Sequence, residues 1–309
     1  MGAEPTYSIS YGKARVPFYR VYAQPLVGLT PIPESEFTGR PNVLFAAEVD
    51  VEVFGDNFLP AYTEGDNANV VATDSMKNFV FAQALAYEGA TLEGLLEHLG
   101  RSFLATYAQM QRLRLTGREL PFSTARVPQG AGFGASAVLF SRSHDDHTLA
   151  VLEFVREGDT AVVSGHQCGR AGLQLLKVTG SSFTRFVRDA YTTLPERGDR
   201  PLFIAMNVSW KYADVADALG HDPARYVPAE QVRDLVQVVF HQFVSESIQH
   251  LVHAMGQRML ERFPQLAEIT LEAQNHTPDP LAISETDPKV KVYSSPFPAY
   301  GLIKLTLTR

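Results

Sequence analysis

The stretch VLFAAEVDVEVF, residues 43–54, ends in a strict alternation of apolar and acidic side chains. Its last three valines fall on one side of the chain, and Asp50 and Glu52 fall on the other. Successive side chains of a β-strand point to opposite faces, so this alternation predicts a strand with one buried face and one polar face. A sheet built from such strands needs a layer of helices on its apolar face.

The covering layer is predicted soon after this strand. Residues 78–115 have the composition of a helix that is broken near YEGAT, residues 87–91. Apolar side chains recur from Leu92 to Met110 at spacings of three and four, which places them on one helical face. We expect that face to pack on the sheet.

The remaining elements follow the same order in each half of the chain. Two strands around a polar turn are expected in residues 136–155, and a turn at Gly158-Asp159 ends the first half. The second half is predicted to contain strands at 160–163, 173–178 and 202–210, one long helix that starts after Pro228 and reaches Met259, and final strands at 268–274 and 300–308. The predicted domains are therefore residues 1–157 and 158–309.

Neither half has the regular alternation of strands and helices, or the GxGxxG motif, of a parallel nucleotide-binding sheet. The predicted fold class is α+β, with antiparallel sheets that carry helices on one face. The other face of each sheet then needs a ligand or a partner subunit, so we expect an oligomer.

The composition restricts the partners. The 309 residues carry a net charge of −7, which disfavours a nucleic-acid partner because such binders usually show a basic face. Cys168 is the only cysteine, which excludes an intramolecular disulfide and a CxxC site. The first ten residues lack the apolar core of a signal peptide and no long apolar run occurs, so we expect a cytoplasmic protein without a membrane segment.

Three histidine-containing stretches are candidates for chemistry. HDDH and the His250-His253 pair could bind a metal, and HQCGR could carry a nucleophilic Cys168 if a histidine base lay nearby. HDDH at 144–147 falls at the tip of the expected hairpin, where polar residues are common, and HQCGR at 166–170 has the composition of another polar turn. His250 and His253 have the spacing of two ligands on one helical face, but no acidic partner falls at a matching position. No metal site is predicted.

The connector at residues 173–200 is more informative. It carries Phe183 and Leu194 and ends at Arg200, just before the next strand. Such a pattern is typical of a packing connector, but a phenyl face and a guanidinium can also clamp a flat anionic heterocycle by stacking and a bidentate hydrogen bond. Gln249 on the long helix is either a surface glutamine or an amide for the edge of such a ring.

Thr73-Asp74-Ser75 marks the point where a short apolar strand runs into a helix. Residues of this kind usually cap a helix. The N–H groups of a first helical turn can equally bind an anionic ligand. These three residues alone leave both interpretations open.

Taken in order, these motifs resemble the urate oxidase (uricase) family. The shared motifs are YGKARV at 11–16, DNANVVATDSMKN at 66–78, the pattern L-x-L-L-K-x-T-x-S-x-F-x2-F-x4-Y-x2-L-x5-R at 173–200, SIQ at 247–249, the Asn275-His276 pair and YGLIKLTL at 300–307. The long pattern is specific because so many fixed residues at fixed spacing do not recur by chance. The resemblance extends over nearly the full chain.

The resemblance implies two tandem tunnelling-fold domains, whose sheets join between subunits into a barrel as a homotetramer. It implies oxidation of urate by O2 and water to 5-hydroxyisourate and hydrogen peroxide, with no metal and no organic cofactor. The alternative is a tunnelling-fold enzyme or binding protein that acts on a different purine or pterin. Such enzymes often use zinc, and the single cysteine and scattered histidines disfavour this alternative.

The resemblance also assigns roles by matching position. Phe183 would stack on the purine, while Arg200 and Gln249 would hold its edges and Asn275 would hold the water or O2. Backbone N–H groups near Asp74 and Ile248 would complete the cradle. The substrate-binding residues implied are Thr73, Asp74, Phe183, Leu194, Arg200, Ile248, Gln249 and Asn275.

The implied proton relay pairs Lys13 and Thr73 from neighbouring subunits. Lys13 accepts a proton only in its neutral form, which burial or a nearby cation favours. In better-known members a histidine two positions after the asparagine completes the relay, whereas here His276 follows Asn275 directly. Neighbouring strand residues point to opposite faces, so either His276 is re-aimed by a bulge or turn, or Thr277 acts through its hydroxyl. We predict His276.

Overall fold

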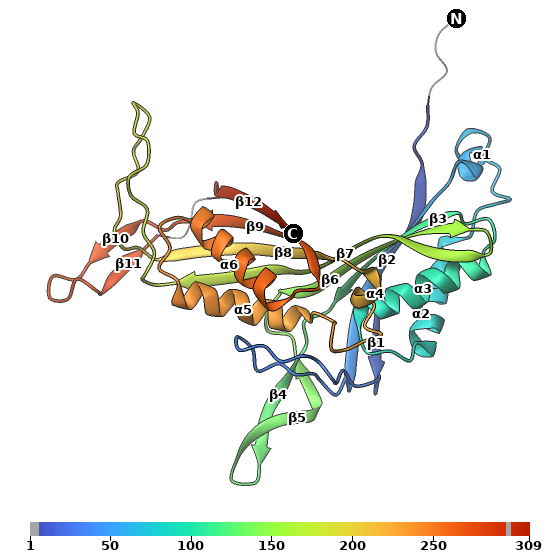
Figure 1. The fold of residues 1–309 in the computed structure, drawn as a ribbon, viewed down its shortest axis with the longest axis horizontal. Helices are drawn as coiled ribbons and strands as arrows, with labels where there is room; N and C mark the ends of the chain where they lie inside the picture. The colour runs from blue at the N-terminus through green and yellow to red at the C-terminus, as the bar shows by residue number, and fades with distance from the viewer. Residues whose placement is uncertain (1–5, 295–297) are drawn as a thin grey trace, which may run out of the picture. The chain divides into compact units, whose positions relative to one another are not determined.

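The computed structural model describes residues 6–294 and 298–309 (Figure 1). These residues form two compact units. The first unit comprises the chain up to Thr30, Thr38–Cys168 and Asp214–Tyr226, and the second comprises Pro31–Phe37, Gly169–Ala213 and the chain from Val227 onward. The prediction that the chain has no signal peptide rests partly on residues 1–5, which lie outside the described residues.

The first unit contains the strand that is predicted within residues 43–54. Its sheet follows the order β1 (Ser10–Val21), β2 (Leu44–Phe54), β3 (Arg112–Glu119), β6 (His147–Glu157) and the first part of β7 (Thr160–Lys177). β1, β2, β3 and β6 pair antiparallel. The valines of β2 are buried, whereas Asp50 and Glu52 are half-buried, so the predicted alternation is confirmed.

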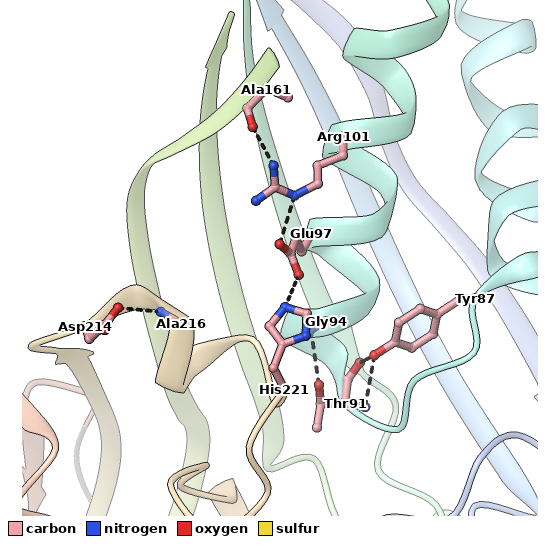
Figure 2. Close-up of polar contacts among 9 residues, drawn as sticks. All are labelled: Tyr87, Thr91, Gly94, Glu97, Arg101, Ala161, Asp214, Ala216 and His221. Carbon is pink, nitrogen blue, oxygen red and sulfur yellow. Dashed lines mark hydrogen bonds and ion pairs between the residues drawn. The ribbon is translucent and has the colours of Figure 1, made fainter. Parts of the chain in front are cut away.

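Helices α2 (Thr73–Ala86) and α3 (Leu92–Thr106) supply the predicted covering layer. Their buried side chains form one core with the apolar face of β2, β3 and β6. Thr91 caps α3 by accepting a hydrogen bond from the N–H of Gly94 at 3.1 Å (Figure 2). The predicted helix end at residue 115 is wrong, because α3 ends at Thr106 and β3 already begins at Arg112.

Smaller elements complete the first unit. They are the short helices η1 (Asp56–Phe58), α1 (Leu59–Thr63) and α4 (Val215–Ala218), and the hairpin of β4 (Ser123–Gln129) and β5 (Gly132–Ser141). The HDDH stretch follows β5 and ends in the first residue of β6, but the predicted hairpin of these two strands is wrong, because β5 pairs with β4 and β6 pairs with β3.

The second unit has a sheet in the order β7, β8 (Leu202–Tyr212), β9 (Leu266–His276) and β12 (Gly301–Thr308), in which β9 pairs antiparallel with both neighbours. Helices α5 (Ala229–Gln242) and α6 (Ile248–Arg262) and the hairpin of β10 (Pro280–Ile283) and β11 (Lys291–Tyr293) complete it. Each unit thus combines a largely antiparallel sheet with helices, which confirms the α+β class.

Two predictions in the second half are wrong. The strands predicted at 160–163 and 173–178 are parts of the single strand β7. The predicted long helix is two helices, because Phe243 leaves the helical conformation and Ser247 caps α6 by accepting from the N–H of His250 at 3.1 Å. This break places Ile248 and Gln249 in the first turn of a new helix.

The predicted domain boundary at residues 157 and 158 falls in the turn between β6 and β7, whereas the compact units divide within β7, at Cys168 and Gly169. The tandem-domain division therefore stays a prediction. Among the residues that the structure describes, none of the helices is both long and apolar enough to cross a membrane.

Candidate active site

A pocket of about 230 Å³ lies in the second unit, where α6 begins and β9 and β12 meet. It brings together the substrate-binding residues predicted for this half, namely Phe183, Leu194, Arg200, Ile248, Gln249 and Asn275. Thr277, Gly301 and Ile303 complete the lining. The pocket therefore gathers residues from a connector, a helix start and two strands that lie far apart in the sequence.

Arg200 is the charged group of this pocket and is only 6% exposed. Its guanidinium carbon lies over the ring of Phe183, 5.4 Å from the centroid, and Nη1 donates to Thr277 Oγ1 at 3.4 Å. Nε is buried and has no hydrogen-bond partner. Burial, with a smaller contribution from Arg197, lowers the pKa of Arg200 below its ordinary value. Within the described residues no carboxylate forms an ion pair with Arg200, so a buried cation faces the pocket without a counter-ion.

The connector is irregular but anchored. Phe183 and Arg197 exchange backbone hydrogen bonds at 2.9 and 3.0 Å, and the N–H of Arg200 donates to the carbonyl oxygen of Ser181 at 2.8 Å. The ring of Phe186 stacks on that of Phe183 with centroids 4.8 Å apart and planes inclined by 9°. These contacts fix the phenyl ring and the guanidinium relative to each other, as a stacking clamp requires.

The start of α6 supplies the second edge of the pocket. Ile248 is 3% exposed, whereas Gln249 is exposed. The first N–H groups of a helix have no partner inside it, and the helix dipole favours negative charge there. The break between α5 and α6 therefore places an anion-favouring helix end and a free amide side chain at the same pocket.

The end of β9 supplies the third edge. Thr277 Oγ1 donates to Asn275 Oδ1 at 2.8 Å, and both side chains line the pocket. His276 is not among the residues that line it. Its ring contacts those of Phe203 and Tyr300, with centroids 5.5 and 5.1 Å away, and Nε2 lies 3.2 Å from Gln274 Oε1. The relay role predicted for His276 stays a prediction.

Lys13, Thr73 and Asp74 belong to the first unit and do not line this pocket. Thr73 and Asp74 lie in the first turn of α2, whose N-cap is Ala72 and has no side-chain cap, so the capping interpretation is wrong for these residues. The hydrogen bond from Lys77 at 2.5 Å is the main reason why the pKa of Asp74 is lowered, and Lys13 is close enough to contribute. The structure thus gathers these three residues near one end of α2.

A bulge positions Lys13. The pairing of β1 with β2 shifts register between Lys13 and Val16, and Arg15 has a positive φ of 56°. A side chain at Gly12 would collide with the carbonyl oxygen of Val51, 1.8 Å from an added Cβ atom, so glycine lets β1 approach β2 closely beside Lys13.

Other candidates from the sequence have structural roles. His144 contacts Asp146 at 2.8 Å within its own turn. Cys168 is buried, and burial raises the pKa of its thiol well above the ordinary value, so it is no nucleophile. Among the described residues, no three His, Cys, Asp or Glu side chains gather in a way that could hold a metal ion.

Three features were missed in the sequence. Gly301 and Ile303 line the pocket, and the only signal was their place in the closing motif of the family resemblance. A larger cavity of about 910 Å³ is also lined by Arg200, with Lys289 and Lys291, and nothing in the sequence pointed to it. It contains none of the other predicted site residues, so we place the site in the smaller pocket.

Comparisons with known proteins show the family of the chain. The family model for uricase matches residues 10–154 and 166–304. The chain is 50% identical to a uricase of Haloferax volcanii, over 87% of this chain and 88% of the relative. It is 45% identical to the uric acid degradation bifunctional protein PucL of Bacillus subtilis over 98% of this chain, but it spans only 61% of that relative.

Solved structures agree with the fold. The urate oxidase of Bacillus sp. TB-90 superposes with a TM-score of 0.94 at 45% identity, over 97% of this chain and all of the other. A uricase from Bacillus fastidious gives a TM-score of 0.94 at 42% identity, over 99% of this chain and 94% of the other. The second bifunctional relative, from Bacillus sp. TB-90, is also longer, and the chain spans 60% of it.

Proposed function

Because the chain belongs to the uricase family, we propose that it oxidises urate with O2 and water to 5-hydroxyisourate and hydrogen peroxide, with no metal or organic cofactor. The observation that carries this proposal is Arg200, a buried guanidinium without a counter-ion that lies over a fixed phenyl ring in a small pocket. A flat purine anion satisfies the ring and the charge together.

Each wall of the pocket then has a task. Phe183 stacks on the purine, Arg200 binds one edge through charge-assisted hydrogen bonds, and Gln249 binds another through its amide. The N–H of Ile248 lies in the first turn of α6, where the helix dipole favours a negatively charged ligand. Leu194 supplies an apolar wall, and together these groups select a planar anion.

The remaining groups come from a second subunit. We assign Lys13 and Thr73 as a proton relay and the N–H of Asp74 as a further contact. The resemblance implies that Lys13 and Thr73 come from neighbouring subunits, whereas we propose that one neighbouring copy supplies all three, in a homotetramer whose sheets join into a barrel. The gathering of these three residues near one end of α2, apart from the residues that line the pocket, supports this assignment. A complete site then requires assembly.

The chemistry follows from spin and charge. O2 is a triplet and reacts slowly with closed-shell molecules, so the protein must make urate electron-rich by stabilising a deprotonated form. Lys13 takes the proton through Thr73, and Arg200 offsets the anion. Urate loses two electrons to O2, which with two protons becomes hydrogen peroxide, and water adds its oxygen to the oxidised purine to give 5-hydroxyisourate. Asn275 holds the water or O2.

The test is an oxidase assay on the full chain. Protein treated with a strong chelator is mixed with urate in air, and urate absorbance and hydrogen peroxide are followed together. We expect urate loss with an equal amount of peroxide. A folded, oligomeric protein that leaves urate intact would contradict the proposal, and binding of urate without turnover would favour a purine-binding protein. Activity on a pterin that disappears with the chelator would favour a zinc-dependent relative.

A further inference from the structure

Three polar side chains are linked by two successive hydrogen bonds along one wall of the pocket. Arg200 Nη1 donates to Thr277 Oγ1 at 3.4 Å, and Thr277 Oγ1 donates to Asn275 Oδ1 at 2.8 Å. A guanidinium can only donate, so the hydroxyl oxygen of Thr277 is the acceptor in the first bond and its hydrogen is free for the second. Arg200 therefore determines which group donates and which accepts in both hydrogen bonds.

This direction fixes the amide of Asn275. An asparagine side chain has an acceptor end and a donor end that differ little in shape. The acceptor end, Oδ1, is taken by the hydroxyl of Thr277. The Nδ2 end is therefore left as the donor that Asn275 can offer in the pocket it lines.

The strand geometry separates Thr277 from His276. β9 keeps a regular register at this end, where Asn275 pairs with Gly301 and Ile204, and His276 pairs with Phe203. The only register shift between β8 and β9 lies at the far end, at Lys211 and Tyr212. Without a bulge, Asn275 and Thr277 fall on one face and His276 falls on the other, where its ring contacts are found.

We propose that Thr277 is a positioning residue that turns the amide of Asn275 so that its NH2 group faces the water or O2 in the pocket. The proposal rests on the urate oxidase function proposed above and extends it. Thr277 touches no reacting atom in this account. It acts through Asn275, and it links the O2 side of the pocket to the guanidinium that holds the anion.

The test compares two substitutions at one position. Thr277→Val keeps the shape and removes the hydroxyl, whereas Thr277→Ser keeps the hydroxyl. Thr270→Val is the matched control, since Thr270 lies on β9, the strand that ends just before Thr277, and among the described residues its hydroxyl bonds to that of Thr306 at 2.8 Å, away from the pocket. The measurements are kcat and the KM values for O2 and urate, the anaerobic Kd for urate, and thermal melting.

We expect Thr277→Val to lower kcat/KM for O2 by about ten-fold or more, the cost of one lost orienting hydrogen bond, and to change the anaerobic Kd for urate by less than about three-fold. Thr277→Ser should retain most of the wild-type value, and Thr270→Val should match wild type. All variants should melt near the wild-type temperature. Since a merely structural role would not separate O2 from urate, the split between the two substrates is the decisive readout.

Three results would overturn the proposal. An active wild type with an unchanged kcat/KM for O2 in Thr277→Val would refute the positioning role alone. A larger loss in His276→Gln than in Thr277→Val would return the role to His276. A folded wild type without urate oxidation would refute the proposed function, and the role of Thr277 with it.

Discussion

Two buried charged side chains, Glu97 in the first unit and Arg200 in the second, differ in what surrounds them. Glu97 is 8% exposed, and its two oxygens contact Arg101 Nε at 2.9 Å and His221 Nε2 at 2.8 Å (Figure 2). Arg200 is 6% exposed, has no carboxylate partner among the described residues and keeps Nε unpaired. Burying a charge is costly unless it is paired. A buried charged side chain whose partners all lie within the protein has a structural role. One that lacks a partner indicates a binding site for a ligand of opposite charge.

Glu93, one turn before Glu97 on α3, is a third case. It is fully buried, the hydroxyl of Tyr226 donates to Oε2 at 2.8 Å, and Oε1 is unpaired. Burial is the main reason why its pKa rises to about 7. A carboxyl group can be buried in its neutral form, whereas a guanidinium stays charged, so only Arg200 needs a counter-ion from outside.

The largest effect is expected from Arg200→Gln. Arg200 is the one cation among the described residues that line the pocket, and its removal should lower kcat/KM for urate by about a thousand-fold, as expected for loss of a buried charged partner. The melting temperature should stay the same or rise, because the substitution removes an uncompensated buried charge. Steady-state kinetics and thermal melting measure both quantities.

The matched control is Arg101→Gln, which removes a cation that has its partner within the chain. Arg101 pairs with Glu97 and donates to the carbonyl oxygen of Ala161 at 2.6 Å, and its side chain is half-exposed. The Arg101→Gln variant should lose about 1 kcal/mol in its free energy of unfolding and should keep its activity. If Arg200→Gln loses stability and keeps activity while Arg101→Gln does the reverse, the comparison between paired and unpaired charges fails.

A smaller effect on turnover is expected at the first-unit residues. Lys13 is intermediate between the paired Glu97 and the unpaired Arg200. A carboxylate, that of Asp74, lies near it but already accepts a hydrogen bond from Lys77. Lys13→Gln and Thr73→Val should each lower kcat by about a hundred-fold, the lower range for lost general acid–base catalysis, with a small change in the anaerobic Kd for urate. Full turnover in Thr73→Val would remove it from the relay.

The smallest effect on activity is expected at Glu93, where the substitution acts on stability and its pH dependence. The pKa of Glu93 is about 7 in the folded chain, against 4.5 for an ordinary glutamate, so its contribution to stability is full below pH 4.5 and is lost as the pH rises through 7. Glu93→Gln mimics the neutral carboxyl group. It should gain at most about 3 kcal/mol over wild type at pH 8 and nothing at pH 4.

Unfolding in denaturant at the two pH values measures this gain, and activity should not change. Glu97→Gln is the control, because Glu97 is paired and its replacement should destabilise the chain at pH 8. A Glu93→Gln variant that is less stable than wild type at pH 8 would show that Glu93 is needed as a charged group.

The fold was predictable wherever one face of an element is buried. The alternation in β2 and the helical spacing in α3 followed from burial on one side, and both were confirmed. The break between α5 and α6 was missed because Phe243 and Val244 continue the apolar spacing, and only the cap at Ser247 marks the new helix. β7 was split in two because SGHQCGR, at 164–170, has the composition of a turn.

The pocket was predictable only in part. The resemblance identified Phe183, Arg200 and Gln249, but residue spacing cannot show that a guanidinium is buried without a counter-ion. The period of two along β9 already places Asn275 and Thr277 on one face. Whether a bulge re-aims His276 depends on pairing with β8 and β12, which the sequence of one strand does not encode.

The most direct test of the central claim is a crystal structure of the assembled protein with urate bound in the absence of O2. We predict that the guanidinium of Arg200 donates two hydrogen bonds to one edge of a urate that stacks on Phe183. Urate bound elsewhere, for example beside Lys289 and Lys291, would contradict the account. So would a carboxylate from a neighbouring subunit paired with Arg200, because the missing partner would then be protein and not substrate.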